Sequence, residues 1–416
     1  MNRFQFNKNA GVTVIEVLFA AGIAVFGLIG IASLIGVAGR QASQANEVAE
    51  AQALSNSWYA DFVTRGFNDS SQWRWFNDQL GGAFAAKFVA YSASGTPSSF
   101  TSTPSTRTAY RHAVCIDPTF FADATNITAM SPPNTFGSGQ AYRPGLFPYY
   151  QDNFDPLTSP VATIDFPTHP NFLNVDMPRL LRVSLASSAT SVAAGIMSES
   201  LVEQLFQSHD DLGPVQDEED KTLAAIRFIG AGGGKLLSKG EYNWFATLSP
   251  REFASSLEFG NSSQEKLYTL DVVVMHRRDR QFFIPASGGV ENIPQGERLL
   301  AVTPPFVSGS ATNYLPFTGG SGGRVVMSAS IEVSDKIHIG DWVMLARHQD
   351  ATVSRSTVVR WYRVIGLDAE PTLTAATWSR NVILDGPDWV FSGANPTQAT
   401  LVSNVVTVLE RVIPVY

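Results

Sequence analysis

The chain has 416 residues, of which 44% are hydrophobic, 11% aromatic and 16% charged, and its formal net charge is -8. A chain of this length forms a substantial core in one to three folded units, which excludes a small disulfide-stapled module. The net negative charge gives no general attraction to phosphate backbones, so we do not expect the whole molecule to bind nucleic acid nonspecifically. The single cysteine, Cys115, excludes an intramolecular disulfide and a cysteine-based zinc site.

The amino-terminal region combines a basic start with a long apolar stretch. The first ten residues contain Arg3 and Lys8 and no acidic residue, and Gly11 follows them. From Val17 to Gly39, every residue except Ser33 is apolar or glycine. A helix of this length spans roughly 30 to 35 Å, which is enough to cross a bilayer. The basic residues before the stretch predict a cytoplasmic amino terminus and an exported body.

Other interpretations of this stretch differ in how well they fit. A buried helix of a soluble core is usually shorter and has a polar edge, which this stretch lacks. A secretory signal peptide would find small residues for cleavage at 36–39, but its apolar region is shorter. An uncleaved signal anchor stays open, because it differs from a processed segment only in what happens at Gly11.

Glu16 places a carboxylate at the start of the apolar stretch. An ionisable group in a membrane segment is costly to desolvate and is therefore a functional candidate. Residues 9–39 contain no Lys, Arg or His, so the segment supplies a cation only if cleavage creates a new α-amino group. Cleavage after Gly11 makes Val12 that terminus, one helical turn from Glu16 on the same face. Solvation of Glu16 by lipid headgroups is the alternative.

The sequence around Gly11 resembles the class III leader and cleavage site of type IV pilins and pseudopilins. The resemblance rests on Lys8, Gly11, Val12, Thr13, Val14, Ile15, Glu16, Val17 and Leu18. In that family a prepilin peptidase cuts after the glycine and methylates the new amino terminus. The family's glutamate pairs with the amine of an adjacent subunit during assembly. The resemblance therefore implies processing at Gly11 and Val12 and an assembly role for Glu16.

Two positions depart from the family pattern. Val12 stands where phenylalanine is usual, and Ser33 stands where many major pilins have a helix-kinking proline. The run from Val25 to Ala32, with the alanine-rich segment 40–54 after it, resembles the PilV type of minor pilin. These likenesses end near residue 60 and imply nothing specific about the rest of the chain.

An apolar stripe predicts that the helix continues beyond the membrane-length stretch. Apolar residues recur there every three or four positions, at Val48, Ala51, Leu54, Trp58 and Phe62. Such spacing places them on one helical face, which we expect to be core. The helix is expected to end near Gly66.

The first part of the body is predicted to be rich in loops. Residues 67–223 contain many Ser, Thr, Pro, Gly and Asn residues, which favour loops and short extended segments. A helix is expected from Ser198 to Gln207. Residues 113–116 are typical of a buried strand, in which Cys115 is expected to be an inert packing residue.

The rest of the body shows strand patterns separated by Gly, Pro, Asn and Asp. They predict an antiparallel sheet or a small barrel, in which 339–345 pairs with 360–364. The glycines of 319–323 are expected to form a flexible break. The expected strands are 223–229, 267–275, 324–333, 341–346, 358–365, 381–384 and 405–413.

Two glycine-rich segments resemble catalytic or phosphate-binding motifs only superficially. Residues 319–323 match the nucleophile-elbow pattern, but a strand is predicted after them where an elbow needs a helix. Residues 230–235 resemble a phosphate loop, but the glycine spacing is wrong and Leu236 replaces the required Ser or Thr. We therefore predict no catalytic site at either place.

The histidines and the acidic residues give no strong metal-site pattern. The six histidines are scattered, and His276, beside Arg277 and Arg278, is expected to be a surface group at a strand end. The acidic residues between 210 and 220 suit a hard cation such as calcium but match no EF-hand loop. A solvated acidic loop is the favoured interpretation.

The predicted fold class is α+β, with a pilin-like long amino-terminal helix and a large antiparallel β-rich body. The expected parts are a leader at 1–11, the helix at 12–66, a loop-rich insertion or first part of the body at 67–223, and a β-rich domain at 224–416.

The expected function is that of a minor pilin or pseudopilin, a structural subunit with no enzymatic activity and no cofactor. Its expected partners are prepilin peptidase, other pilin or pseudopilin subunits and the inner membrane, and DNA uptake fits such a filament. The body is expected in the periplasm or at the cell surface after assembly. The alternative is a signal-anchored envelope protein whose body binds a ligand or catalyses a reaction.

Overall fold

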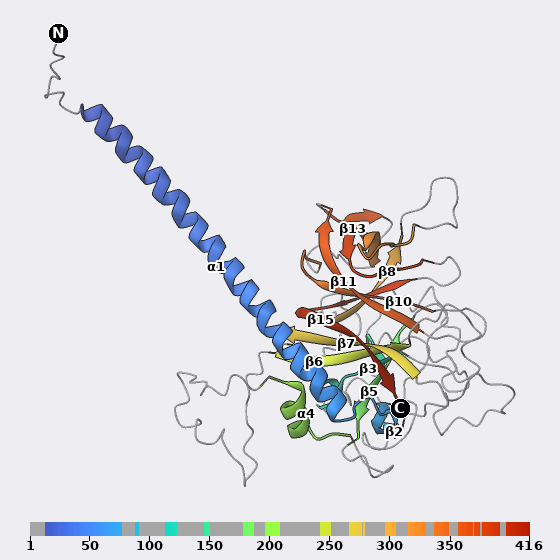
Figure 1. Cartoon of the computed structure of the whole chain (residues 1–416). Helices are drawn as coiled ribbons and strands as arrows, with labels where there is room; N and C mark the ends of the chain where they lie inside the picture. Colours follow the sequence, from blue (N-terminus) through green and yellow to red (C-terminus); the bar gives the residue numbers. More distant parts are fainter. Residues whose placement is uncertain are drawn as a thin grey trace, which may run out of the picture. The chain divides into compact units, whose positions relative to one another are not determined.

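The residues that the structure describes form a long helix with an apolar first part and a β-rich body of two sheets, so the chain is an α+β protein (Figure 1). It divides into two compact units, residues 1–50 and residues 51–416. The computed structural model describes residues 13–76, 88–90, 113–122, 145–149, 178–186, 196–208, 242–250, 266–276, 278, 296–304, 315–329, 337–348, 357–368, 370–374, 377–391 and 397–416.

Helix α1 (Val14–Thr64) ends close to where the sequence predicts. Gly66 has a φ of 71°, a left-handed conformation that glycine adopts without steric strain. The Gly66 N–H donates to the Val63 carbonyl at 3.1 Å, and the Phe67 N–H donates to the Phe62 carbonyl at 3.0 Å. These two bonds form a Schellman cap, and the Phe62 and Phe67 rings add an edge contact with centroids 5.9 Å apart. The predicted helix end near Gly66 is confirmed.

The last part of α1 buries most of the predicted apolar stripe. Ala51 and Phe62 are fully buried, Trp58 is buried, and Leu54 is half-buried. Val48 is 40% exposed, so the core expectation is wrong at that position. The stripe is therefore core from Ala51 onward.

The first sheet has eight strands in the order β15-β7-β6-β3-β5-β1-β2, with β4 paired to β5. Neighbouring strands are antiparallel except β3 and β5, which are parallel. This sheet contains strands from both sides of residue 223. The predicted boundary between 67–223 and 224–416 therefore does not separate the two sheets. Its strands are β1 (Trp73–Phe76), β2 (Phe88–Ala90), β3 (Val114–Ile116), β4 (Leu146–Phe147), β5 (Leu180–Leu185), β6 (Tyr242–Pro250), β7 (Lys266–His276) and β15 (Val405–Val415).

One face of the first sheet packs against α1 and helix α4 (Glu199–Phe206). Trp244 of β6 lies in this contact, where its ring stacks on Phe206 at a centroid distance of 4.4 Å and on Trp58 at 5.9 Å. The helix predicted from Ser198 to Gln207 is confirmed, with those two residues as its caps.

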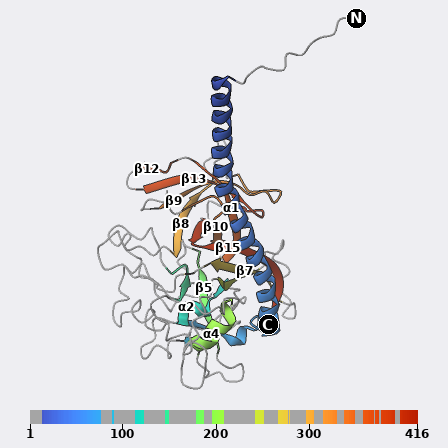
Figure 2. The ribbon, with the colours of Figure 1, turned by 90° about the vertical axis from the view of Figure 1, so that its left-hand side faces the viewer.

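The second sheet closes into a six-stranded barrel. Its strand order is β11-β10-β14-β8-β9-β13-β12, and β11 also pairs with β13, which closes the ring and leaves β12 outside it. All pairs are antiparallel, and the interior is filled by apolar side chains. Figures 1 and 2 show these strands grouped apart from β5. The strands are β8 (Glu297–Thr303), β9 (Gly323–Ala329), β10 (Trp342–His348), β11 (Thr357–Leu367), β12 (Thr372–Thr374), β13 (Thr377–Asp385) and β14 (Gln398–Val402).

The predicted strands agree with these elements wherever the structure describes them. The predicted pairing of 339–345 with 360–364 is confirmed, because β10 and β11 are antiparallel with Met344 opposite Trp361. The predicted strand 223–229 lies outside the described residues. The remaining predicted strands correspond to β7, β9, β10, β11, β13 and β15.

The other face of the first sheet packs against the outside of the barrel. Phe245 of β6 and Trp361 of β11 lie in this layer with Cys115 of β3. Cys115 is fully buried, and burial raises the pKa of its thiol well above the ordinary value. A protonated buried thiol is a poor nucleophile, which agrees with the predicted packing role.

The glycine-rich segment 319–323, predicted as a flexible break, forms a turn with specific contacts. Gly319, Gly320 and Gly322 have φ values of 79°, 67° and 65°. The Gly320 N–H donates to the Asp388 carboxylate at 2.7 Å. The turn leads directly into β9, so a helix does not follow it as a nucleophile elbow requires.

We expect Gly322→Ala to destabilise the barrel. A Cβ there would lie 2.0 Å from the Leu384 carbonyl oxygen and 2.8 Å from the Asp385 Cα, which are both backbone atoms. Together with the positive φ, this clash should cost about 2 to 4 kcal/mol. Gly319→Ala is the matched control, because its φ is also positive but no atom lies within 4 Å of its Cβ. Chemical denaturation measures both variants, and equal losses would contradict the packing argument.

Candidate functional site

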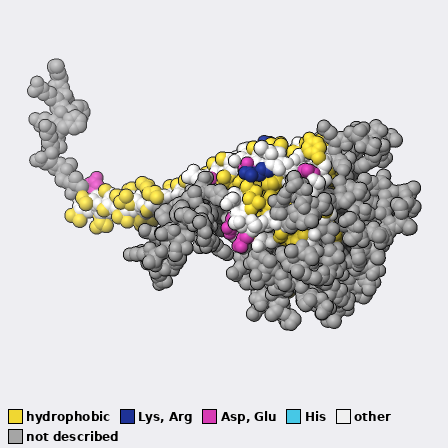
Figure 3. Space-filling view, turned by 90° about the horizontal axis from the view of Figure 1, so that it is seen from below, with side chains coloured by type: hydrophobic (Ala, Val, Ile, Leu, Met, Phe, Trp, Pro, Cys, Tyr) yellow, Lys and Arg dark blue, Asp and Glu magenta, His cyan; other side chains and the backbone are white. Residues whose placement is uncertain are grey.

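The first part of α1, from Val14 to Gly39, is 26 residues long with a mean hydropathy of 2.5. None of its most apolar window is buried, and the side chains of Val14 and Phe26 are 81% and 78% exposed. Figure 3 shows hydrophobic side chains along the helix. This length and composition suit a membrane anchor or a signal segment.

Ser33 interrupts this apolar surface without leaving a polar group unsatisfied. Its hydroxyl donates to the Gly30 carbonyl one turn earlier at 2.8 Å. Helix α1 continues through Ser33, where many major pilins have a proline. A hydroxyl bonded within its own helix can enter a bilayer at reduced cost.

Glu16 lies in the first turn of α1 with an exposed side chain. Within the described residues its carboxylate has no hydrogen-bond or ion-pair partner, while its N–H bonds to the Thr13 carbonyl at 3.0 Å. Gly11 and Val12, the predicted cleavage site, lie outside the described residues. The pairing of Glu16 with a Val12 amine therefore stays a prediction.

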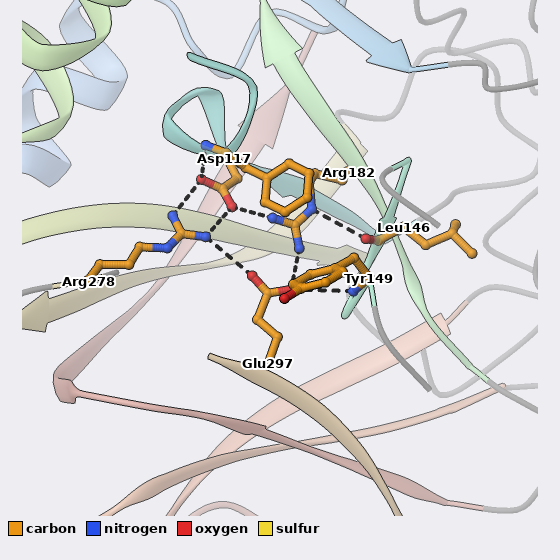
Figure 4. A network of polar contacts seen from close by, with 7 residues as sticks. Asp117, Leu146, Tyr149, Arg182, Arg278 and Glu297 are labelled. Carbon is orange, nitrogen blue, oxygen red and sulfur yellow. Dashed lines mark hydrogen bonds and ion pairs between the residues drawn. The ribbon is translucent and has the colours of Figure 1, made fainter. Parts of the chain in front are cut away.

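A second candidate site is a group of four buried charged side chains, which we call the charge network: Asp117, Arg182, Arg278 and Glu297. Asp117 follows β3, Arg182 lies in β5, Arg278 follows β7, and Glu297 begins β8 of the barrel. No side chain of the network is more than 8% exposed. The network joins the first sheet to the barrel (Figure 4).

Each carboxylate of the charge network contacts both arginines. Arg182 Nη1 and Arg278 Nη2 each lie 2.6 Å from Asp117 Oδ2, and Arg278 Nη1 lies 2.7 Å from Asp117 Oδ1. Arg278 Nη2 lies 3.2 Å from Glu297 Oε1, and Arg182 Nη2 pairs with Glu297 Oε2. The bidentate contact of Arg278 with Asp117 is a strong geometry for a guanidinium and a carboxylate.

Aromatic and backbone groups complete the surroundings of the network. The Phe120 ring, on helix α2 (Pro118–Ala122), has its centroid 3.7 Å from Arg182 Cζ. Arg182 Nε donates to the Leu146 carbonyl at 3.3 Å, and the Tyr149 N–H donates to Glu297 Oε2 at 3.3 Å. The network therefore also positions the segments that carry α2 and β4.

The electrostatics of the network keep Asp117 ionised. Burial alone would raise the pKa of its carboxyl, but the charge and hydrogen bonds of Arg278 and the charge of Arg182 outweigh burial. With an added hydrogen bond from the Phe120 N–H, they hold the pKa of Asp117 below its ordinary value. Asp117 raises the pKa of Arg278 in return, against the effect of burial. Asp117 and Arg278 therefore keep their charges at neutral pH, which suits structural pairing and not proton transfer.

The charge network was not predicted, although the sequence contains a signal for it. Arg182 is the only charged residue in the apolar run 180–185, and Asp117 directly follows the apolar residues 113–116. A charge in a strand that is otherwise buried needs a charged partner, so both positions indicate an ion pair. The partners, Arg278 and Glu297, stand in segments without such a pattern.

The prediction for His276 and its neighbours is only partly right. His276 does end β7, but it is half-buried, with its ring centroid 5.2 Å from that of Tyr242. Arg278, two residues later, is buried in the charge network. The His and Arg residues at the end of this strand were predicted to be surface groups, but His276 is half-buried and Arg278 is buried.

Asp271 of β7 is another buried carboxyl group between the sheets. Thr247 Oγ1 donates to Asp271 Oδ2 at 3.0 Å, whereas Asp271 Oδ1 has no hydrogen-bond partner among the described residues. Trp361 Nε1 of the barrel donates to Thr247 Oγ1 at 3.0 Å. Burial, followed by the charge of Glu410, raises the pKa of Asp271 to about 7, against the effects of Arg360 and the Thr247 hydrogen bond.

Metal binding has no support in the described part of the chain. Among those residues there is no group of three or more His, Cys, Asp or Glu side chains placed to hold an ion. The acidic segment 210–220, for which calcium was considered, lies outside the described residues.

Comparison with known proteins gives no match: no family model, no curated protein and no solved structure matches this chain. The apolar helix with its acidic first turn, and the charge network, are therefore interpreted from their own geometry and chemistry.

Proposed function

We propose that the chain is a minor pilin or pseudopilin, a structural subunit of a type IV pilus-like or type II secretion filament. The observation that carries the proposal is the 26-residue apolar part of α1, whose first turn holds Glu16 without a partner among the described residues. A carboxylate in that place needs a cation if it enters a bilayer or a helical bundle.

An α-amino group at Val12 fits that need. Val12 and Glu16 are four residues apart, so an amine at Val12 of one subunit reaches the depth of Glu16 in its neighbour when the two helices pack with an axial offset of about 6 Å, roughly one helical turn. Prepilin peptidase acting after Gly11 creates that amine. The proposal therefore includes prepilin peptidase, other filament subunits and the inner membrane as partners.

The β-rich body gives the subunit its particular role in this proposal. Its charged groups in the network are buried and paired, and Cys115 is a buried protonated thiol. A rigid body of this kind suits a place at the tip or along the surface of a filament, with a role in adhesion, initiation or DNA uptake.

Mass spectrometry of the mature amino terminus tests the proposal. In cells that contain a prepilin peptidase, we expect the mature chain to begin with N-methylated Val12. An intact Met1 under those conditions would refute processing and favour an uncleaved signal anchor. A cut at residues 36–39 would instead identify a secretory signal peptide and also refute the proposal.

Glu16→Ala tests the assembly role. We expect the variant to be processed and inserted in the membrane normally but to be lost from purified filaments, because the Val12 amine has no carboxylate to meet. Glu50→Ala is the matched control, since it removes a carboxylate from the same helix outside the apolar part. Immunoblots of membrane and filament fractions measure both. Normal incorporation of Glu16→Ala would contradict the role.

A further inference from the structure

Strand β15 is the outer strand of the first sheet in the part of the chain that the structure describes. It is hydrogen-bonded to β7 from Val405 to Val415, with a single irregularity between Val405 and Thr407. Figure 1 shows β15 beside β7. An outer strand presents one row of backbone N–H and C=O groups that its neighbour does not use.

The direction of these backbone groups follows from Pro414. The Pro414 carbonyl accepts a hydrogen bond from the Asn68 side chain at 3.1 Å, so it faces away from β7. In an antiparallel pair, outward and inward residues alternate, and the register from Thr407 to Val415 is uninterrupted. The N–H and C=O groups of residues 408, 410 and 412 therefore also face away from β7.

Both ends of this outward row are occupied. At one end, Trp342 Nε1 donates to the Val406 carbonyl at 3.2 Å. At the other end, Asn68 holds the Pro414 carbonyl and proline has no N–H. Between them, no described residue bonds to the N–H groups of residues 408, 410 and 412 or to the carbonyls of residues 408 and 412. The Glu410 carbonyl accepts only from the exposed side chain of its neighbour Arg411, at 3.1 Å, and a pairing strand would replace that bond. We call this segment, residues 408–412, the open edge.

The open edge carries an acidic side chain, Glu410, whose carboxylate makes no ion pair with a described residue, although Arg411 bonds to its backbone carbonyl. Glu410 is exposed and lies directly opposite Asp271 in the β15–β7 register. Because this is an outward-facing pair, the two residues are not hydrogen-bonded to each other and their side chains lie close together. Two neighbouring carboxyl groups favour a basic side chain on the free side of Glu410.

A second copy of β15 is a poor occupant of the open edge. Only one antiparallel register of two β15 strands uses all three outward residues of both, and it places Glu410 opposite Glu410. If one of the two strands is shifted by two residues, one of its outward residues lies opposite Val406 or Pro414 of the other strand. The carbonyls of Val406 and Pro414 already accept hydrogen bonds, so a shifted register has fewer hydrogen bonds between the two strands. Like charges directly opposite destabilise a strand pair.

We propose that the open edge of β15 binds an extended segment of a different polypeptide, with a Lys or Arg side chain opposite Glu410. Three outward residues suit a segment of about five residues, because alternate residues make the bonds. This interaction goes beyond a role in a filament and does not depend on it, since it uses only the body.

Two synthetic peptides serve as probes: Thr-Val-Thr-Lys-Thr-Val-Thr and the same peptide with Glu at its centre, both with blocked ends. They are added to the full chain in detergent, and amide hydrogen exchange is measured along β15. We expect the Lys peptide to slow exchange at residues 408, 410 and 412 by about tenfold or more at saturation, and the Glu peptide to have little effect. Exchange at residues 409 and 411, which bond to β7, reports that the strand stays folded.

Two variants and one control make the test specific. Val412→Pro removes an outward N–H without removing a bond to β7, so it should abolish protection by the Lys peptide at residues 408 and 410. Val412→Ala keeps the N–H and should keep the protection. Glu410→Lys should reverse the preference, so that the Glu peptide protects and the Lys peptide does not.

Three outcomes would overturn the proposal. They are absence of protection by both peptides, equal protection by both, and protection by the Lys peptide that survives Val412→Pro. Sedimentation of the full chain gives a fourth: a dimer that Val412→Pro dissociates would identify a second copy as the occupant and refute binding of a different polypeptide.

Discussion

Arg182→Ala is expected to destabilise the body by about 3 to 5 kcal/mol, the cost of breaking a buried ion pair from one side. The side chain of Arg182 is fully buried between Asp117 and Glu297. Its removal leaves two buried carboxylates to share Arg278, and it removes the hydrogen bond to the Leu146 carbonyl. A loss of this size is a large fraction of the stability of an ordinary domain.

Chemical denaturation of the full chain in detergent, followed by tryptophan fluorescence, measures the effect. Arg324→Ala is the matched control: Arg324 pairs with Asp368 at 3.2 Å, but the two side chains are 57% and 49% exposed. An exposed pair contributes about 1 kcal/mol or less. If Arg182→Ala and Arg324→Ala cost the same, the charge network does not stabilise the junction of the sheets.

A double variant separates charge from packing in the same experiment. Arg182→Met with Glu297→Gln leaves Arg278 and Asp117 as a neutral bidentate pair and keeps the apolar volume. We expect it to be more stable than Arg182→Met alone, which has the same side chain at position 182 but leaves a carboxylate without a cation. A double variant no more stable than Arg182→Met alone would mean that the unpaired charge is not the cause of the loss.

The second large effect is expected from Asp271→Asn, which should increase the free energy of unfolding by an amount that depends on pH. The pKa of Asp271 is about 7 in the folded chain, against an ordinary value of 3.8. The folded chain then holds this proton where the unfolded chain has released it, so stability falls as pH rises from about 4 to 7 and stays low above that. A difference of about three pH units corresponds to about 4 kcal/mol, which is the upper limit of the gain at pH 8.

Denaturation of wild type and Asp271→Asn at pH 4, 6 and 8 tests this expectation. The two proteins should be similar at pH 4 and differ most at pH 8, with the variant more stable. Glu410→Gln should give a smaller gain of the same sign, because the charge of Glu410 raises the pKa of Asp271 less than burial does. A difference between wild type and Asp271→Asn that does not vary with pH would contradict the prediction.

Asp117 has the opposite dependence on pH. The pKa of its carboxyl is lower in the folded chain, so its contribution is present above the pKa of the unfolded chain. That contribution is lost as pH falls through the folded value. The two buried aspartates thus favour a stability maximum on the acidic side of neutrality. Stability falls in stronger acid because Asp117 becomes protonated, and it falls at higher pH because of the raised pKa of Asp271.

Local patterns in the sequence were enough to predict α1, α4 and about half of the described strands, namely β3, β7, β9, β10, β11, β13 and β15. The end of α1 near Gly66 follows from a glycine after a periodic apolar face, and β7 and β11 follow from runs of β-branched and aromatic residues. These signals lie within a few residues of each other, so no knowledge of distant segments is needed.

Features that depend on distant segments were not predicted. Closure of the barrel needs β11 to pair with β13 as well as β10, and no local pattern specifies that second pair. The charge network brings Asp117 and Arg182 together with Glu297, which follows 115 positions after Arg182. A lone charge in an apolar strand indicates that a partner exists, but the fold decides which residue it is.

The position of the barrel in the chain has a consequence for how the protein can be rearranged. All barrel strands lie between β7 and β15, which are neighbours in the first sheet, and the His276 N–H bonds to the Asn404 carbonyl at 2.9 Å. The barrel is thus a cassette inserted into a hairpin, and its two ends leave and re-enter the body side by side. A different domain inserted at the same place would also need to supply a carboxylate in the position of Glu297, because Arg182 and Arg278 would otherwise share Asp117 alone.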